Sequence, residues 1–424
     1  METFFLVLAV TGVLTQLLVL ILALFEPGLP YNIPDTPGIP SESNEFARVL
    51  AIISDAHLHN DNALEVLTNG TTFYEAELEA IRSARSHICL EAYIFQKGHV
   101  ASRFIGALTE RARNGVEVRV VLDAVGSFNT WRSTFSELIS AGGQVHWYMP
   151  LRWYNLTRFN NRTHREIVIV DGTVAFIGGA GIADHWYNGH RRSKPWRDTM
   201  VRVRGSSVAS LQSMFAENWL ECSGELLTSD KYYPGDAKPG RAQAMVINST
   251  PSYGRSNRAR MVFQILIATA ARRIHITTPY FLPDRGACQA LIDALNRGVE
   301  VKILVPGKHS DHLLTRRSSR RLYGPLLQNG AEIYEYRPAM IHCKSLVVDG
   351  RWTVVGSTNF DSRSFGINDE VNIAALDEQV SARMEEDFQA DLEVSRPITY
   401  ADWHRRPLLQ RATEWMGWII ERQE

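Results

Sequence analysis

The stretch HCKSLVVDG at residues 342–350 decides the fold, because the chain repeats it as HREIVIVDG at residues 164–172. Each copy places a histidine before a short, mostly apolar run and an Asp-Gly pair. The β-branched apolar residues predict a buried strand, and Asp-Gly predicts a turn directly after it. Residues i and i+2 of a strand lie on one face, so His342 and Lys344 should point the same way.

The sequence around the two copies repeats as well. RNGVEVRVVL at residues 113–122 matches NRGVEVKILV at residues 296–305, and HICLEAYIF at residues 87–95 matches RIHITTPYF at residues 273–281. Amphipathic helices precede the apolar runs. We therefore expect an α/β protein with two similar domains, each a mixed, mostly parallel sheet flanked by helices. Two such domains can form a pseudo-dimer that brings one histidine from each to a shared interface.

Local composition predicts where the two domains and the linkers begin and end. The first domain should span residues 49–222 and the second residues 242–397, because residues 223–241 are polar and rich in Pro and Gly. Residues 27–48 contain a Pro-rich linker, which is typical of an extended spacer. Residues 398–424 predict a C-terminal amphipathic helix with two tryptophans, either packed on the body or lying at a membrane interface.

Residues 1–26 predict a transmembrane anchor. The run from Phe4 to Phe25 carries no charge, and at about 1.5 Å per residue it spans roughly 33 Å, close to a bilayer core of about 30 Å. A cleaved signal peptide is the alternative, but no basic residue precedes the run and no small-residue cleavage site follows it. We expect a single-pass protein of the cell membrane. The first basic residue after the run is Arg48, so the positive-inside rule leaves the side of the catalytic domains open.

Overall composition excludes other classes of protein. Among 424 residues, 45 Lys and Arg stand against 46 Asp and Glu, for a formal net charge of -1. This balance argues against a general electrostatic grip on nucleic acid. The four cysteines are too few for a disulfide framework, and none is spaced as CxxC, which also argues against a structural zinc site.

The repeated motif carries chemistry suited to phosphate esters. An imidazole can attack phosphorus, and an ammonium two residues away can hold the anion. The chain resembles the phospholipase D superfamily in its two motifs of His-x-Lys (or Glu) followed by x4-Asp, and further strings resemble the bacterial cardiolipin synthases of that superfamily. These strings are PYFLPD (residues 279–284), RGVEVKILVP (297–306), GSTNFDSRSF (356–365), NDEVN (368–372) and PWRDT (195–199).

The resemblance implies a two-step phosphodiester exchange without metal or cofactor. One histidine attacks phosphorus and forms a phosphohistidine, while the other protonates the departing alcohol and later deprotonates the acceptor. It implies that His164 is the nucleophile and His342 the acid and base, although the near symmetry of the mechanism leaves the reverse assignment open. It also implies that carboxylates serve crosswise, with Asp198 orienting His342 and Glu370 orienting His164.

Other residues complete the expected site. The catalytic set also includes Lys344, Asp171 and Asp349. A turn or an interdomain hydrogen bond is the structural alternative for the two aspartates, because each ends a strand before Gly. The residues expected to bind substrate are Asn359, Ser357 and Glu166.

Two positions of the first copy depart from the pattern of the family. Glu166 stands where the family has Lys, and Gly181 stands where it commonly has Asn. A carboxylate beside the nucleophile should repel phosphate, so an inactive half-site is one interpretation. The favoured interpretation is an asymmetric site in which Lys344 and Asn359 hold the phosphate. Glu166 would then pair with a base such as Arg162 or meet a substrate hydroxyl.

The resemblance implies a cardiolipin synthase, which transfers a phosphatidyl group from one phosphatidylglycerol to the glycerol hydroxyl of another and releases glycerol. The expected partners are phosphatidylglycerol as substrate and the membrane, with no nucleic acid. The alternatives are a phospholipase D-type hydrolase, transfer to a different alcohol, a nuclease, and a membrane-bound relative that has lost turnover. The predicted anchor and the balanced charge disfavour the nuclease.

Overall fold

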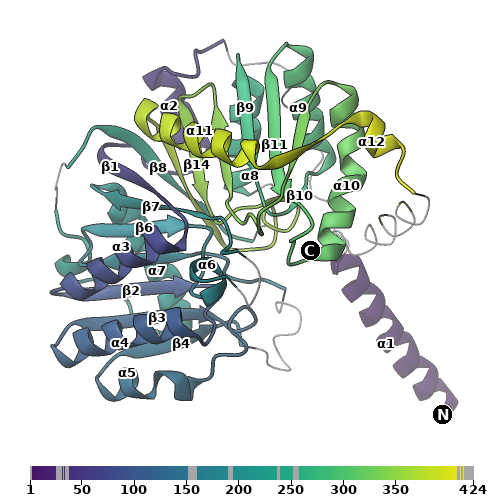
Figure 1. Ribbon diagram of the computed structural model, residues 1–424. Helices are drawn as coiled ribbons and strands as arrows, with labels where there is room; N and C mark the ends of the chain where they lie inside the picture. The colour runs from purple at the N-terminus through teal and green to yellow at the C-terminus, as the bar shows by residue number, and fades with distance from the viewer. Residues whose placement is uncertain are drawn as a thin grey trace.

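One continuous mixed sheet forms the centre of the protein (Figure 1). The computed structural model describes residues 2–24, 31, 33, 38–150, 160–189, 194–235, 239–251, 257–407, 411 and 414. From one edge to the other, the strands of the sheet are β17 (Ser395–Ile398), β12 (Glu332–Tyr336), β11 (Glu300–Pro306), β9 (Arg273–Thr277), β13 (Ser345–Val348), β14 (Trp352–Gly356), β16 (Glu370–Leu376), β8 (Ala242–Ser249), β1 (His59–Thr68), β7 (Thr199–Arg204), β6 (Val174–Gly178), β5 (Ile167–Val170), β2 (His87–Ala92), β3 (Glu117–Asp123) and β4 (Gln144–Tyr148). A separate parallel pair consists of β10 (Phe281–Leu282) and β15 (Phe360–Asp361).

The two halves of the sheet have the same strand order about their junction. The order β4-β3-β2-β5-β6-β7-β1 in the first half corresponds to β12-β11-β9-β13-β14-β16-β8 in the second, and β1 pairs antiparallel with β8 to join them. The registers agree as well, because Ile88 pairs with Val118 just as Ile274 pairs with Val301. The sequence repeat is therefore a repeat of whole half-sheets.

The expectation of mostly parallel sheets was wrong. In the described part of each half, β2, β3 and β4 (or β9, β11 and β12) run parallel, but the pairings from β5 to β1 (or β13 to β8) are antiparallel and outnumber them. One of these pairings in each half, β5 with β6 or β13 with β14, follows from the turn that starts at Asp171 or Asp349. A turn of a few residues sends the chain straight back, so the next strand can pair only in the antiparallel sense.

Helices cover both faces of the sheet. In the first half, Phe73, Leu78 and Phe104 of two helices pack on one face, while Phe215 and Trp219 of a third pack on the other. The second half repeats this arrangement (Figure 1). The helices are α2 (Asn44–Ile53), α3 (Gly70–Ser83), α4 (His99–Arg113), η1 (Arg132–Phe135), α5 (Ser136–Ser140), α6 (Asp184–Tyr187), α7 (Ser207–Ser223), η3 (Asp230–Tyr232), α8 (Arg258–Thr269), α9 (Arg285–Asn296), α10 (Leu313–Gln328), α11 (Glu378–Glu393) and α12 (Tyr400–His404).

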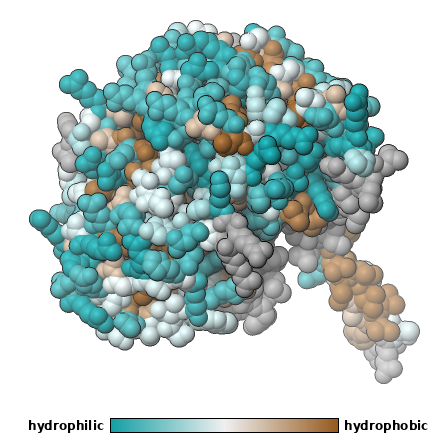
Figure 2. Space-filling model, viewed as in Figure 1, coloured by the Kyte–Doolittle hydropathy of each residue, from teal (hydrophilic) through white to brown (hydrophobic). Residues whose placement is uncertain are grey.

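An apolar helix, α1 (Glu2–Leu24), projects from this body (Figure 1), and its side chains at residues 3–18 are exposed. Figure 2 shows it as an apolar rod beside a mostly polar surface. Across the described part of the chain, none of the helices combines the length and the apolar character needed to cross a membrane. Much of the linker expected within residues 27–48 lies outside the described residues, and so do both tryptophans of the expected C-terminal helix, Trp415 and Trp418.

The strand directions place both histidine motifs at one edge of the sheet. Because β5 runs antiparallel to β2, the chain enters β5 at the edge where β2 and β3 end. The same relation holds between β13 and β9. His164 and His342, which precede β5 and β13, therefore lie where the carboxyl ends of the parallel strands meet.

Candidate active site

Backbone hydrogen bonds cross between the halves at each histidine. The His164 N–H donates to the carbonyl of Asp369 over 2.8 Å, and the His342 N–H donates to the carbonyl of Arg197 over 2.7 Å. Each pairing holds a histidine of one half beside the residue that precedes a carboxylate of the other half. Because of these backbone hydrogen bonds, the carboxylate of each half lies beside the histidine of the other half.

Each imidazole is hydrogen-bonded to the carboxylate from the opposite half. His164 Nδ1 lies 3.1 Å from both oxygens of Glu370, and His342 Nδ1 lies 2.9 Å from Asp198 Oδ2. Both carboxylates are fully buried, and Asp198 also accepts from the indole N–H of Trp186 over 2.9 Å. A carboxylate on Nδ1 fixes the ring orientation and leaves Nε2 for chemistry. This is the pairing that the resemblance implied.

Lys344 supplies a cation directly against His342. Its Nζ lies 2.7 Å from Nδ1 and 3.0 Å from Nε2 of that ring, and it donates to the His342 carbonyl over 2.9 Å. The carbonyl of Gly179, from the first half, is 3.4 Å away. The ammonium is buried, so its attraction for an anion is screened less than it would be at the surface.

Burial and charge set the protonation of this cluster. Burial, together with the charge of Lys344, lowers the pKa of His342, so its imidazole is neutral near pH 7. Burial alone would raise the pKa of Asp198, but the hydrogen bond from His342 and the charge of Lys344 bring that pKa below its ordinary value. An ionised Asp198 then accepts the Nδ1 proton, and the Nε2 lone pair of His342 lies 3.0 Å from the Nζ of Lys344.

Comparisons with known proteins agree with this arrangement. Residues 78–219 and 264–392 match a family model described as "Cardiolipin synthase, PLD-like domain". The chain is 33% identical over 377 residues to the major cardiolipin synthase of Bacillus subtilis, across 88% of this chain and 78% of that protein. The chain belongs to the phospholipase D-like cardiolipin synthase family.

Further relatives support the same family, and the resemblance seen in the sequence is confirmed. Cardiolipin synthase 1 of Staphylococcus epidermidis is 33% identical over 382 residues, across 89% of this chain and 77% of that protein. The crystal structure of a phosphatidylserine synthase from Haemophilus influenzae has a TM-score of 0.69 at 16% identity, over 90% of this chain and 100% of that chain. At that identity the structural match shows a shared fold.

Asp171 and Asp349, the final residues of the two family motifs, lie away from the reacting groups. Each is seven residues beyond its histidine, which at about 3.3 Å per residue is roughly 20 Å along the strand. Asp171 accepts from the backbone N–H groups of Arg85, Ser86 and His87, and Asp349 accepts from those of Ala271, Arg272 and Arg273. These hydrogen bonds favour the structural alternative, in which each aspartate closes a turn within its own half.

Glu166 stands at the family's lysine position, and its carboxyl group accepts hydrogen bonds from the backbone. Its Oε1 accepts from the N–H groups of Tyr93 over 3.1 Å and of Ile94 over 3.2 Å. Burial raises the pKa of Glu166 well above its ordinary value, although those two amides and the charge of Lys344 oppose the shift. The shift favours the protonated form, which would repel phosphate less than a carboxylate does.

The expected partner of Glu166 was wrong. The guanidinium of Arg162 donates to the carbonyl of Met149 over 2.9 Å and lies 3.5 Å from a carboxylate oxygen of Asp123.

The second departure from the family pattern, Gly181, has a steric reason. A Cβ on Gly181 would lie 2.5 Å from the carbonyl oxygen of Ile94 and 3.0 Å from Glu166 Oε1, so an asparagine has no room there.

Ser357 and Asn359 have different surroundings, although both were expected to bind substrate. The Ser357 hydroxyl is fully buried and donates to Glu370 Oε2 over 2.5 Å. It contacts the carboxylate that is hydrogen-bonded to His164, which favours a positioning role over the expected contact with substrate. Asn359 is also buried, but its Oδ1 has no hydrogen-bond partner among the described residues. It remains available to a ligand.

Aromatic rings surround the histidines, and sequence reasoning assigned them no role. The His342 ring centroid lies 5.4 Å from Trp186, 5.6 Å from Trp196 and 6.5 Å from Tyr280. The His164 centroid lies 5.0 Å from Tyr93. Trp196 and Tyr280 stand inside two of the family strings, so their positions were visible in the sequence. The contact of Trp196 with His342 depends on how the halves meet, because the two residues belong to different halves.

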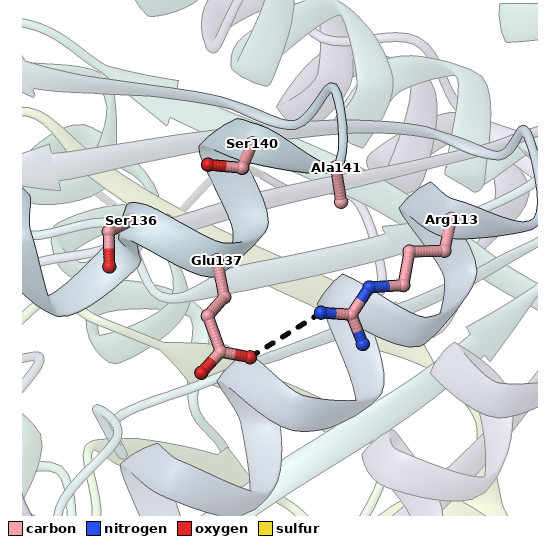
Figure 3. A pocket seen from close by; sticks show the side chains of 5 residues that line it. All are labelled: Arg113, Ser136, Glu137, Ser140 and Ala141. Atoms are coloured by element: carbon pink, nitrogen blue, oxygen red, sulfur yellow. Dashed lines mark ion pairs between the residues drawn. The ribbon is translucent and has the colours of Figure 1, made fainter.

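A surface hollow elsewhere lies apart from this site. It is lined by Arg113, Ser136, Glu137, Ser140 and Ala141, and Figure 3 shows the pair of Arg113 and Glu137, which are 3.5 Å apart. Arg113 ends α4 just before the start of β3, so the hollow faces the edge opposite to the histidines. Both charged side chains are more than half exposed, and such pairs add little energy.

Proposed function

We propose that the protein is a membrane-bound cardiolipin synthase that works through a phosphohistidine, with its two halves acting as a pseudo-dimer. The observation that carries the proposal is the pair of imidazoles held crosswise by Glu370 and Asp198, with Lys344 against one of them. Two oriented nitrogens and one buried cation are what a two-step phosphodiester exchange requires.

In the first step, Nε2 of His164 attacks the phosphorus of phosphatidylglycerol. The bond from phosphorus to the glycerol oxygen breaks, and His342 donates a proton to that oxygen so that neutral glycerol leaves. The arriving phosphodiester anion favours the protonated form of His342, which burial otherwise disfavours. Lys344 and the amide of Asn359 stabilise the charge that develops on the phosphoryl oxygens.

In the second step, a hydroxyl of another phosphatidylglycerol attacks the phosphohistidine. Its proton passes to Nε2 of His342, an oxygen–phosphorus bond forms, and the bond from phosphorus to His164 breaks. Cardiolipin and the original imidazole result. His164 is the nucleophile in this scheme because its side chain is 13% exposed against 5% for His342, and because the cation that would oppose its attack lies at the other ring.

Attachment to the membrane is the second part of the proposal. α1 exposes apolar side chains between Phe4 and Leu18. The loop after β3 and the first residues of α10, which follow β11, also expose apolar side chains at the edge of the sheet that holds the histidines. These are Phe128, Trp131, Leu313 and Leu314, with exposed fractions of 66%, 68%, 55% and 44%. Apolar groups on both sides of a site suit a substrate that is drawn from a bilayer.

Expression in cells that lack cardiolipin tests the activity. Lipid extracts should gain cardiolipin with the wild-type protein and none with His342→Ala, provided that both proteins reach the membrane fraction in equal amounts. Phosphatidic acid instead of cardiolipin would identify a hydrolase. An unchanged lipid profile, or cardiolipin from the His342→Ala variant, would remove the proposal.

A further inference from the structure

The repeat of the two halves is broken beside His342. Counted from the matching strand pairs, Tyr280 of the second half corresponds to Ile94 of the first, and Asp311 corresponds to Phe128. A polar pair therefore stands where the other half has two apolar side chains. Nothing in the histidine chemistry proposed above uses this pair.

The two side chains form one unit at the entrance to His342. The phenol of Tyr280 donates to Asp311 Oδ2 over 2.7 Å, and the backbone N–H of His312 donates to Asp311 Oδ1 over 3.0 Å. The Tyr280 ring stands edge-on to His342, with centroids 6.5 Å apart. The Asp311 carboxylate is 21% exposed, so it remains open to a ligand, and its charge acts on His342.

The chemistry of this pair suits hydroxyl groups. A carboxylate repels the phosphate that Lys344 attracts, so Asp311 cannot serve the phosphoryl oxygens. A carboxylate and a phenol do accept hydrogen bonds from alcohols, and a polyol can satisfy both of them at once. The alcohol that leaves and the alcohol that enters both exchange a proton with His342, so both must lie on this side of phosphorus.

We propose that Tyr280 and Asp311 form the subsite for the glycerol headgroup, which holds the leaving glycerol of the donor and then the glycerol of the acceptor. The inference rests on the proposed function and adds a basis for choosing glycerol over water. With the secondary hydroxyl held by Asp311, the primary hydroxyl faces Nε2 of His342. It loses its proton to that nitrogen as it attacks phosphorus, and the bond from phosphorus to His164 breaks.

A donor whose leaving group needs no glycerol subsite tests this assignment. The full-length protein is supplied with phosphatidyl-p-nitrophenol in detergent micelles and with free glycerol. Release of nitrophenol reports the first step, and the ratio of phosphatidylglycerol to phosphatidic acid reports how the intermediate divides between glycerol and water. Tyr280→Phe and Asp311→Asn should each lower that ratio about tenfold, since an unpaired hydroxyl is strongly disfavoured, and should change nitrophenol release by less than about threefold.

The chain offers a matched control. Tyr334 donates to Glu332 over 2.5 Å on β12, and Glu332 begins that strand at the edge away from the histidines. Tyr334→Phe and Glu332→Gln should leave the product ratio unchanged. An unchanged ratio in both Tyr280→Phe and Asp311→Asn, or a loss of nitrophenol release that matches the loss of transfer, overturns the subsite. A wild-type protein that releases no nitrophenol would instead contradict the proposed function.

Discussion

At the scale of single residues, Glu166 shows how one unusual side chain is accommodated. Its Oε1 accepts hydrogen bonds from two backbone amides, and burial raises the pKa of the carboxyl group. We predict that Glu166→Gln retains activity within about threefold, because the amide oxygen can accept the same two bonds. Glu166→Lys should lose about 3 kcal/mol or more of folding stability and most of its activity, because a buried ammonium would face two N–H donors. Thermal unfolding and cardiolipin synthesis on phosphatidylglycerol vesicles measure both effects.

The same pair of variants also tests the other interpretation of the first half-site. If Glu166 had simply inactivated that half, restoring the family's lysine would improve phosphate binding. A clear gain of activity in Glu166→Lys would therefore show an impaired relative. The close approach of Gly181 to Glu166 argues for the working, asymmetric site, because the two departures from the family pattern fit each other.

A second buried acid, Glu77 on α3, makes stability depend on pH. Burial raises the pKa of Glu77 to about 8, from an ordinary value of 4.5. The folded protein therefore keeps a proton that the unfolded chain loses as the pH rises above 4.5, so stability falls between pH 4.5 and about 8. We predict that Glu77→Gln raises the free energy of unfolding by up to about 4 kcal/mol at pH 7.5 and by little at pH 5.

Chemical denaturation at the two pH values checks this prediction. Glu79, which is exposed on the same helix, supplies the control, and Glu79→Gln should change stability by less than about 0.5 kcal/mol at either pH. An equal effect of Glu77→Gln at pH 5 and at pH 7.5 would contradict the assignment of a neutral Glu77.

At the scale of secondary structure, the aspartates that end the motifs tie each turn to the chain entering the neighbouring strand. Both have positive φ, 52° for Asp171 and 56° for Asp349. We predict that Asp349→Ala costs about 2–3 kcal/mol, because three N–H groups lose their acceptor in a conformation that Ala disfavours. Asp349→Asn should cost less, since Asn tolerates this conformation and keeps one acceptor oxygen. Turnover of the folded fraction should stay near the wild-type value in both variants.

Asp198→Asn provides the contrast for that experiment. The amide group cannot stabilise a positively charged His342, so this variant should lose turnover by a factor of about 10² or more. Unfolding curves and initial rates of the three variants, measured on the same vesicles, separate the two kinds of aspartate. A catalytic Asp349 would show itself as lost turnover in Asp349→Asn without lost stability.

The repeated motifs predicted the strands well but not how they pair. Apolar runs before Asp-Gly identified β5 and β13, and their helical surroundings identified an α/β fold. The turns after them were also predicted, but the antiparallel pairing that a short turn imposes on the next strand was not. Direction depends on the connection between two strands, and the short turn between β5 and β6 requires an antiparallel pair. The next antiparallel pair, β6 with β7, is joined by residues 179–198, which include α6, so no short turn predicts it.

At the scale of the whole molecule, the site could be predicted only where a residue's role follows from its local motif. His164, His342 and Lys344 were found in this way, and the crosswise carboxylates followed from the resemblance. Tyr280 and Asp311 could not be assigned, because their place beside His342 depends on how loops after two different strands meet. The surroundings of Ser357 could not be predicted for a similar reason, because its hydroxyl group donates to Glu370 on β16.

Membrane attachment is likewise a property of the whole molecule, because it should combine α1 with the apolar loops around the site. We predict that deleting residues 1–26 lowers the protein recovered with phosphatidylglycerol vesicles in flotation but leaves turnover of a short-chain substrate in micelles unchanged. The catalytic body keeps its own cores without α1. Residual binding of the deleted form should depend on the exposed aromatic residues of the first loop, Phe128 and Trp131.

Phe128→Ser with Trp131→Ser in the deleted form should reduce that residual binding further, by about thirtyfold if each ring contributes roughly 1 kcal/mol at the interface. Tyr400→Ser is a matched control, since this aromatic residue lies on α12, beyond β17 at the far edge of the sheet. Full binding by the protein that lacks residues 1–26 would show that α1 is dispensable. Loss of turnover in micelles by that protein would show instead that α1 stabilises the catalytic body.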